Sequence, residues 1–255
     1  MLIFEELEKI AKLKRLSIIN AEKDYLQDIL LFSIYSEVGR ELVFKGGTCL
    51  YKIYKLDRFS EDLDFTLTKK LDAEKLANKI LQNLSLLNIK GRIIEIKEYK
   101  EGINIKFILN GPLYKGSKET QSFIPLNIST RENLFKDPYK ESFISLYREI
   151  PTYELFVMSQ EEILAEKFRA ILTRLKARDI YDLWFLLVKK RVSFNLELVN
   201  NKLSIYDMKF HIQDFKDRVN KMKGLWNTDL KNLVIGELKD FDEVNKDIFN
   251  LLDLK

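Results

Sequence analysis

The side chains best suited to chemistry are two aspartates, Asp62 and Asp64, which are separated by the apolar Leu63. The alternation of Leu63, Phe65 and Leu67 with polar residues predicts a half-buried strand, so both carboxylates would point to one face. Adjacent carboxylates repel each other unless a cation lies between them, and Mg²⁺ or Mn²⁺ bound there would also coordinate phosphate oxygens. The alternative is that the two acids are simply exposed on a sheet face. An Asp-x-Asp pattern taken in isolation favours this alternative.

A glycine turn precedes the aspartates and joins a predicted short strand, residues 42–44, to a predicted short helix. The turn consists of Gly46, Gly47 and Thr48. Glycine lets the backbone approach a ligand closely, and the N–H groups at the start of a helix attract an anion. We expect Thr48 either to cap the helix or to bind phosphate through its hydroxyl. The alternative is an ordinary turn that binds no ligand.

Polar and charged residues flank the turn and favour the binding of a triphosphate. Lys45 directly precedes the turn, and Arg58 and Ser60 lie in the loop that leads to the aspartates. A turn that holds phosphate, followed shortly by a strand that holds the metal of that phosphate, predicts a site for an NTP.

A second group of charged residues lies in the C-terminal part of the chain. Lys167 is on the shoulder of the apolar stripe of a predicted helix, whereas Glu166 and Arg169 are expected to point away from that stripe. Lys167 would either extend past the edge of the core to solvent or point into a cleft. Asp179 and Asp182 are three residues apart and are expected to share a face of the next helix. Instead of serving a functional site, such acids can simply stabilise the N-terminus of the helix.

The residues 44–50 and 58–65 resemble the AbiEii/AbiGii group of bacterial nucleotidyltransferase toxins, which belong to the DNA polymerase beta-type superfamily. The likeness rests on the Gly-Gly-Thr turn and on the pattern Arg-x-Ser-x-Asp-x-Asp that follows it. Members also carry an Ala-Glu-Lys segment and an Arg-Asp-x-Tyr-Asp-Leu segment, which this chain matches at Lys167 and at 178–183. The resemblance extends over roughly 42–188.

The resemblance implies that Lys167 contacts the phosphates of an NTP and that Asp182, or Asp179, takes part in the active site. Superfamily members often place a third carboxylate on a later strand, where this chain has Asn127. An amide cannot act as the base that deprotonates an attacking hydroxyl. Either Asp182 supplies that base, or the metal and the positioning of the reactants drive the attack, and we favour the second.

The order of the predicted elements indicates an α+β fold. N-terminal helices precede a mixed sheet with strands near 92–99, 103–109 and 123–129, and a helix is predicted over 72–87 between them. From Ser159, which forms a capping box with Glu162, the pattern is helical. We therefore expect a nucleotidyltransferase core with N-terminal helices at 1–155 and a helical domain that completes the active site at 156–255.

Composition excludes several classes of protein. No apolar run approaches the roughly 20 residues that a membrane span requires, and the N-terminus has the pattern of an amphipathic helix and not of a signal peptide. One cysteine, Cys49, forms no internal disulfide, which favours the cytoplasm. The single histidine, His211, leaves no serine-hydrolase triad and no histidine-rich zinc site.

The net charge of +4 is too small to demonstrate a nucleic-acid partner, but basic residues cluster along two helical regions, near 169–191 and 209–223. Such clusters either follow phosphates or form ordinary solvated helix faces. We expect a Mg²⁺-dependent transfer of NMP from an NTP to an acceptor, for which a tRNA 3′ end is our candidate. The resemblance also implies a toxin with a cognate antitoxin. The alternatives are a kinase-like transfer of the γ-phosphate to a protein and a degenerate domain that binds nucleotide, RNA or antitoxin without catalysis.

Overall fold

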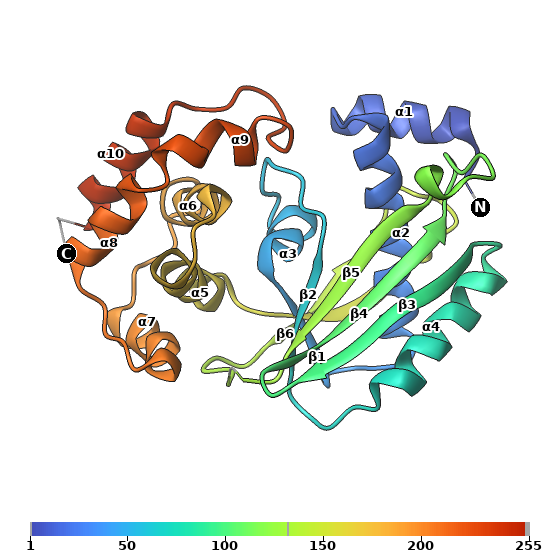
Figure 1. Ribbon diagram of the computed structural model, residues 1–255, viewed down its shortest axis with the longest axis horizontal. Coiled ribbons are helices and arrows are strands. Elements are labelled where there is room, and N and C mark those ends of the chain that lie inside the picture. The colour runs from blue at the N-terminus through green and yellow to red at the C-terminus, as the bar shows by residue number, and fades with distance from the viewer. Residues whose placement is uncertain (1, 132, 253–255) are drawn as a thin grey trace. The chain divides into compact units, whose positions relative to one another are not determined.

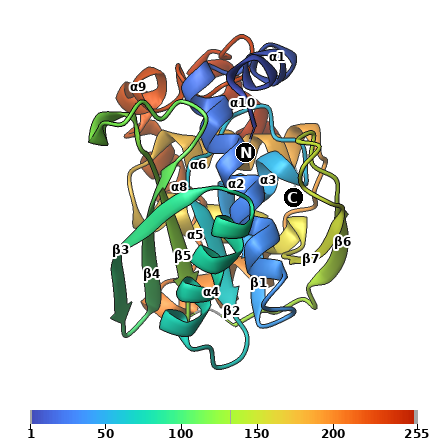
Figure 2. The same ribbon diagram turned by 90° about the vertical axis from the view of Figure 1, so that its right-hand side faces the viewer.

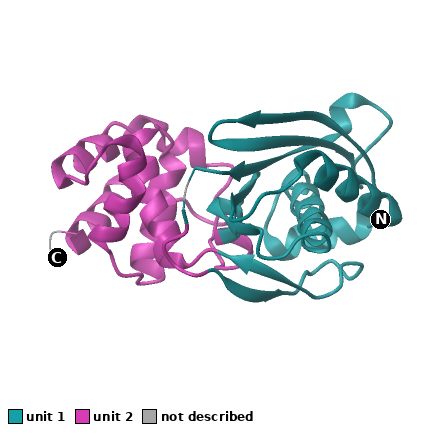
Figure 3. Cartoon of the chain, turned by 90° about the horizontal axis from the view of Figure 1, so that it is seen from below, with its two compact units in different colours: residues 1–49, 59–133, 138–157 teal, residues 50–58, 134–137, 158–255 magenta. Residues whose placement is uncertain are grey.

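The computed structural model describes residues 2–131 and 133–252, and the chain divides into two compact units (Figure 3). The first unit comprises residues 1–49, 59–133 and 138–157, and the second comprises 50–58, 134–137 and 158–255. The domains expected from the sequence were continuous, at 1–155 and 156–255. In the structure, two short segments that precede residue 155, namely 50–58 and 134–137, cluster with the second unit.

The strands of the described residues form one seven-stranded mixed sheet in the first unit, in the order β3-β4-β5-β2-β1-β7-β6. The strands are β1 (Leu42–Lys45), β2 (Leu63–Leu67), β3 (Lys90–Tyr99), β4 (Gly102–Asn110), β5 (Ser122–Ser129), β6 (Tyr139–Phe143) and β7 (Tyr153–Val157). Strand β2 is central, antiparallel to β1 and parallel to β5. This arrangement confirms the predicted α+β class with a mixed sheet.

Three helices of the first unit are α1 (Phe4–Lys14), α2 (Ile18–Tyr35) and α4 (Ala73–Leu86). Figures 1 and 2 show α2 and α4 together on one side of the sheet. Helix α4 begins where the sequence predicts, because the Asp72 carboxylate accepts a hydrogen bond from the Lys75 backbone N–H at 2.9 Å. Its apolar residues at a spacing of four, Leu76, Ile80 and Leu84, are buried.

Strands β4 and β5 alternate strictly between buried and partly exposed positions. Apart from Ser122 at the start of β5, the buried set is apolar, and its exposed fractions lie between 0 and 6%. It consists of Ile103, Ile105, Phe107, Leu109, Ile124, Leu126 and Ile128. One face of this part of the sheet therefore belongs to the core, and the other carries the polar residues, as a period-two pattern requires.

Two predictions of local structure were incomplete. Strands β6 and β7 were not anticipated, because both have five residues and β6 reads Tyr-Lys-Glu-Ser-Phe, with one clearly buried position. The short helix after the turn, α3 (Gly46–Lys52), begins at the glycine itself and ends before Ile53 and Tyr54. The predicted strand at 42–44 and the strand that contains Asp64 were both confirmed.

The second unit is mainly helical, as predicted for the C-terminal part of the chain. Its helices are α5 (Gln160–Thr173), α6 (Ala177–Trp184), α7 (Leu196–Leu203), α8 (Ile212–Asn220), α9 (Trp226–Leu230) and α10 (Phe241–Leu252). The ring of Phe168 on α5 lies 5.0 Å from those of Phe194 and Phe215, which links α5 to the last third of the chain. Across the described residues, no helix combines the length and the apolar character that a membrane crossing demands.

Candidate functional site

Gly46 and Asp64 are packed directly against each other in the first unit. Gly46 has φ +75°, a conformation that side chains rarely adopt, and a Cβ atom added to it would lie 2.5 Å from Asp64 Oδ2. The sequence suggested that this glycine lets the backbone approach a ligand. In the structure, the absence of a side chain at Gly46 leaves space for the carboxylate of Asp64. The turn and the strand that carries Asp64 therefore pack directly against each other.

Thr48 connects the same turn to the first aspartate. Its side chain is fully buried, and its hydroxyl donates a hydrogen bond to the main-chain carbonyl of Asp62. The hydroxyl therefore has a partner within the protein, and we assign to Thr48 the positioning of Asp62. The strand itself starts at Leu63, one residue later than the alternation suggested.

The backbone just before the aspartates is held by helix α2. Gln27 is buried, and its Nε2 donates hydrogen bonds of 2.9 Å to the carbonyls of both Ser60 and Glu61. Ser60, expected near the triphosphate, is also buried, as is Lys45 at the end of β1. Asp62 and Asp64 are half-buried, so their carboxylates are positioned by the fold yet are not sealed from solvent.

Asn127 lies beside Asp64, at the place where the sequence comparison expected a third acid. The parallel register of β2 and β5 pairs the two residues, and Asn127 Nδ2 donates a hydrogen bond to Asp64 Oδ1 at 3.0 Å. Among the described residues, no group of three or more His, Cys, Asp or Glu side chains is placed to hold a metal ion. We call Asp62 and Asp64 the acidic centre: Asp64 has an amide as its neighbour on β5, and Asp62 directly precedes β2.

Lys167 lies within the second unit and is 6% exposed. Its Nζ contacts Asp179 Oδ1 at 2.9 Å and Asp182 Oδ2 at 2.7 Å. The periodicity of the helix gave no sign of this buried ion pair. The prediction that Asp179 and Asp182 share a helix face is confirmed, because both carboxylates reach the same ammonium group.

Arg58 forms a bidentate pair with Asp182. Its Nε and Nη2 atoms each lie 2.6 Å from one oxygen of the Asp182 carboxylate, and both side chains are buried. Burial alone would raise the pKa of the Asp182 carboxyl, but the charges of Arg58 and Lys167 outweigh it and hold that pKa below its ordinary value. The sequence placed Arg58 beside the NTP, whereas the structure gives its guanidinium a partner 124 residues away.

Asp179 connects this buried network to the exposed Arg174. Arg174 Nε and Nη2 lie 2.7 and 2.8 Å from the Asp179 carboxylate. Burial opposes ionisation here too, yet the charges of Lys167 and Arg174 lower the pKa of Asp179 strongly. These five side chains, three cations and two carboxylates, form one connected set of ion pairs.

The segment that carries Arg58 is held by the last third of the chain, which sequence reasoning left without a role. Ile235 N–H donates to the Asp57 carbonyl at 2.8 Å, and Arg58 forms an isolated antiparallel bridge with Val234. The Tyr181 hydroxyl also donates to the Asp57 carboxylate at 2.9 Å. No spacing or motif in the sequence signals these contacts, because they join residues far apart in the chain.

Glu166 was expected to point away from the apolar stripe of its helix, and the structure shows that it is nevertheless buried. Glu166 is 7% exposed and lies 3.5 Å from Lys202, whose ammonium also contacts the fully buried Glu162 at 2.7 Å. The Ser159 hydroxyl accepts from the Glu162 N–H, as a capping box requires. The Glu162 carboxylate, however, accepts at 3.0 Å from the backbone N–H groups of residues 135 and 136 and so anchors that segment.

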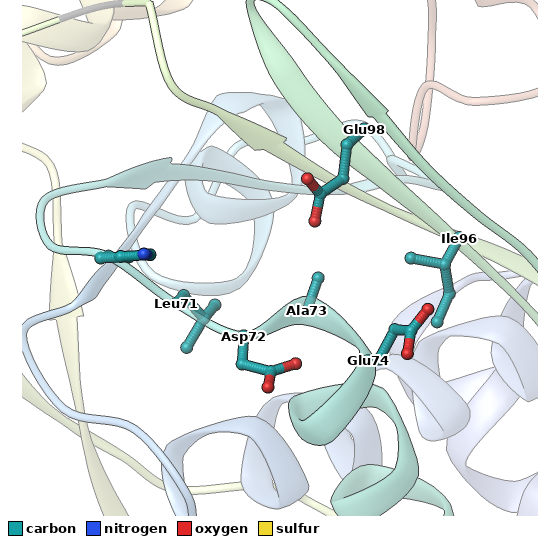
Figure 4. A pocket seen from close by; sticks show the side chains of 7 residues that line it. Leu71, Asp72, Ala73, Glu74, Ile96 and Glu98 are labelled. Carbon is teal, nitrogen blue, oxygen red and sulfur yellow. The ribbon is translucent and has the colours of Figure 1, made fainter.

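A hollow of about 560 Å³ in the first unit lies beside the start of α4 (Figure 4). The carboxylates of Asp72, Glu74 and Glu98 are arranged around it. Asp72 is already engaged as the cap of α4. None of the site residues predicted from the sequence lines this hollow, so it does not alter the assignment of the candidate site.

Comparison of the chain with known protein families gives one match over most of its length. A family model described as the nucleotidyl transferase AbiEii toxin of a type IV toxin–antitoxin system matches residues 29–246. None of the curated proteins matches the chain.

Two solved structures share the fold. The crystal structure of JHP933 from Helicobacter pylori has a TM-score of 0.65 and 22% identity, over 94% of this chain and 92% of that one. MenT4, a nucleotidyltransferase toxin from Mycobacterium tuberculosis, has a TM-score of 0.59 and 19% identity, over 93% and 85%. At these identities the likeness concerns the fold alone.

Proposed function

This chain belongs to the AbiEii family of nucleotidyl transferase toxins, and we propose that it transfers a nucleoside monophosphate from an NTP to a nucleic-acid acceptor. The observation that carries this proposal is the half-buried pair Asp62 and Asp64. The carboxylate of Asp64 is held between the Cα of Gly46 and the amide of Asn127, and the carbonyl of Asp62 is held by Thr48.

We propose that Asp62 and Asp64 hold Mg²⁺ or Mn²⁺. Carboxylate oxygens are the ligands these cations prefer, and one or two carboxylates together with substrate phosphates is the usual form of a Mg²⁺ site. The positioned carboxylates, with the Asn127 amide already bonded to Asp64, fit that pattern. The metal would neutralise charge on the phosphate oxygens during transfer.

The role we assign to Lys167 is contact with the triphosphate. Lys167 lies among three cations, because Arg58 and Arg174 reach the same two aspartates, and cations attract a triphosphate. Lysine has three N–H donors, and the two aspartates account for two of them. Lys45, Gly46, Gly47 and Ser60 are proposed to line the phosphates near the turn.

In the proposed reaction, an acceptor hydroxyl oxygen attacks the α-phosphorus of the NTP. The bond from the α-phosphorus to the oxygen that bridges to the β-phosphate breaks, pyrophosphate leaves and the hydroxyl proton passes to solvent. Asn127 is a neutral amide and cannot accept that proton. Asp182 is bonded to both Arg58 and Lys167, which disfavours its use as a base, so positioning and electrostatics carry the reaction.

An RNA acceptor, with the tRNA 3′ end as the first candidate, is supported by the exposed cations Lys189, Lys190 and Arg191 in the second unit. Arg174, from the same basic region, is engaged with Asp179. If the exposed cations bind RNA, charge reversal at these three positions lowers RNA affinity and spares NTP affinity. RNA binding should also weaken more steeply with salt than NTP binding.

The family description also supports a cognate antitoxin as a partner of this protein. Its single cysteine, Cys49, is buried and unbridged, which supports the reducing cytoplasm as the place of action.

The decisive experiment is incubation with each NTP in turn, labelled on the α- or the γ-phosphate, in the presence of Mg²⁺ and total RNA. Nucleotidyl transfer predicts that the α-label enters RNA and that the γ-label leaves as pyrophosphate. A γ-label retained on a protein would instead establish a kinase-like phosphotransferase.

Asn127 is the observation that favours a second candidate, a domain that binds nucleotide or RNA without catalysis. That reading predicts NTP binding with neither label incorporated. The same incubation therefore separates all three functions.

A further inference from the structure

The outer part of the sheet in the first unit has two chemically different faces. On strands β4 and β5, the apolar face is buried, and α2 and α4 lie on one side of the sheet (Figure 2). The residues on the opposite side, which we call the polar face, are partly or fully exposed. They are Lys90, Arg92, Glu95, Lys97, Tyr99, Asn104, Lys106, Ile108, Phe123, Pro125 and Asn127.

Aromatic rings stand exposed on this polar face. Tyr99 on β3 is 49% exposed and Phe123 on β5 is 44% exposed. Each exposed ring offers an apolar surface on which a nucleic-acid base can stack. The Lys97 ammonium lies 4.9 Å from the centroid of the Tyr99 ring, so a cation and a ring are presented together.

The charge of the polar face is positive. Its cations are Lys90, Arg92, Lys97 and Lys106, and its acid is Glu95, which pairs with Lys106. Four cations and one carboxylate give a sum of +3. Such a surface is complementary to a phosphate backbone.

The polar face is continuous with the acidic centre. The strand registers align Lys97 on β3 with Asn104 on β4, Asn104 with Asn127 on β5, and Asn127 with Asp64 on β2. Register partners point to the same side of a sheet, and neighbouring strands are about 5 Å apart. Phe123 lies four residues from Asn127 along β5, which corresponds to about 13 Å. One surface therefore runs from the rings to the aspartate.

We propose that the polar face of β3, β4 and β5 binds a single-stranded nucleic-acid segment and leads its end to Asp64. This inference rests on the proposed nucleotidyl transfer and adds the path of the acceptor. Bases of a single strand stack on exposed rings, whereas paired bases in a duplex are already stacked and hidden. Asn104 and Asn127 supply amide donors and acceptors between the rings and the metal-binding carboxylates.

The test is the affinity of the full chain for a fluorescent single-stranded RNA of about 12 nucleotides, measured by anisotropy at low salt without NTP or metal. Phe123→Ala and Tyr99→Ala should each raise Kd roughly 5- to 100-fold, the range for loss of one stacked base. Lys97→Glu should raise Kd and reduce its salt dependence. A hairpin with the same bases paired should bind more weakly to the wild type.

Matched controls come from α1, where Phe4 is 50% exposed and Lys9 is exposed. Phe4→Ala and Lys9→Glu should leave Kd unchanged, and thermal melting confirms that each variant folds. Unchanged Kd in both ring variants, or equal losses for single strand and hairpin, would overturn the inference. NTP turnover by Asp64→Ala is measured separately, so failure of the proposed reaction and failure of this surface give different results.

Discussion

The Asn127 amide donates a 3.0 Å hydrogen bond to the carboxylate of Asp64, across the parallel pair β2 and β5. A neutral donor here relieves the repulsion between acids that a third carboxylate would increase. Substitution of Asn127 therefore tests the proposal that the acidic centre holds a cation.

Asn127→Asp should create a third carboxylate beside Asp64. Without metal, the like charges should lower the melting temperature, and with Mg²⁺ or Mn²⁺ the variant should gain more stability than the wild type. We expect the added metal-induced stabilisation to be on the order of 1 kcal/mol. The control is Asn104→Asp, one strand further away, and an equal metal response in both variants would contradict the prediction.

Gly46→Ala should destabilise the protein and impair transfer. The new Cβ would meet Asp64 Oδ2 at 2.5 Å, and φ +75° adds a torsional cost of about 1–2 kcal/mol. Gly116 is a matched control, because its φ is +89° but a Cβ there would meet nothing within 4 Å. Gly116→Ala should therefore show the torsional cost alone and keep activity. Equal effects of the two substitutions on activity would argue against the close fit of Asp64.

Asp62→Ala and Asp64→Ala should each reduce nucleotidyl transfer by roughly 10²-fold or more, because a preorganised electrostatic site loses a charge. Both side chains are half-buried, so circular dichroism should remain that of the wild type. Glu74→Ala is the control for removal of an exposed acid. Turnover close to the wild-type value in either aspartate variant would remove the metal pair from the mechanism.

Lys167→Ala should weaken NTP binding more than Arg169→Ala on the same helix. Removal of Lys167 also leaves Asp179 and Asp182 without one cation, so stability should fall as well. Arg58→Ala separates the two effects. It should destabilise the fold by about 3–5 kcal/mol, because a buried carboxylate loses its bidentate partner, while Lys167 remains. If nucleotide affinity simply follows stability in all three variants, the role of Lys167 is structural.

Acid should destabilise the second unit through Asp179 and Asp182, whose pKa values are lowered in the folded protein. The sign follows from linkage. A carboxyl with a folded-state pKa below its unfolded value of about 3.9 contributes stability above that pH, and loses it as pH falls towards the folded pKa. The unfolding free energy should drop below about pH 4, and more gently in Asp179→Asn. Parallel acid curves for the variant and the wild type would contradict this assignment.

Much of the local structure could be predicted from the order of the residues alone. Strand-like stretches near 103–109 and 123–129 correspond to β4 and β5, the helix predicted over 72–87 corresponds to α4, and the alternation around Asp64 predicted an acidic strand after a glycine turn. These features depend on neighbours within a few residues, so their physical cause is visible in the order of side chains. The resemblance to a family also indicated that Asn127 stands where a third carboxylate is often found, and in the structure Asn127 pairs with Asp64.

The partners in the buried ion pairs could be identified from the tertiary structure but not from the order of the residues. Arg58 pairs with Asp182 across 124 residues, and Ile235 holds the backbone of Asp57, although no periodicity connects these positions. Lys202 and Glu162 are both fully buried. The helical pattern around each of them did not indicate that burial. A buried charge is stable only beside its partner, and that partner is chosen by the packing of distant segments. Sequence spacing therefore predicted where acids and bases lie along the chain, and the fold determined which of them neutralise one another.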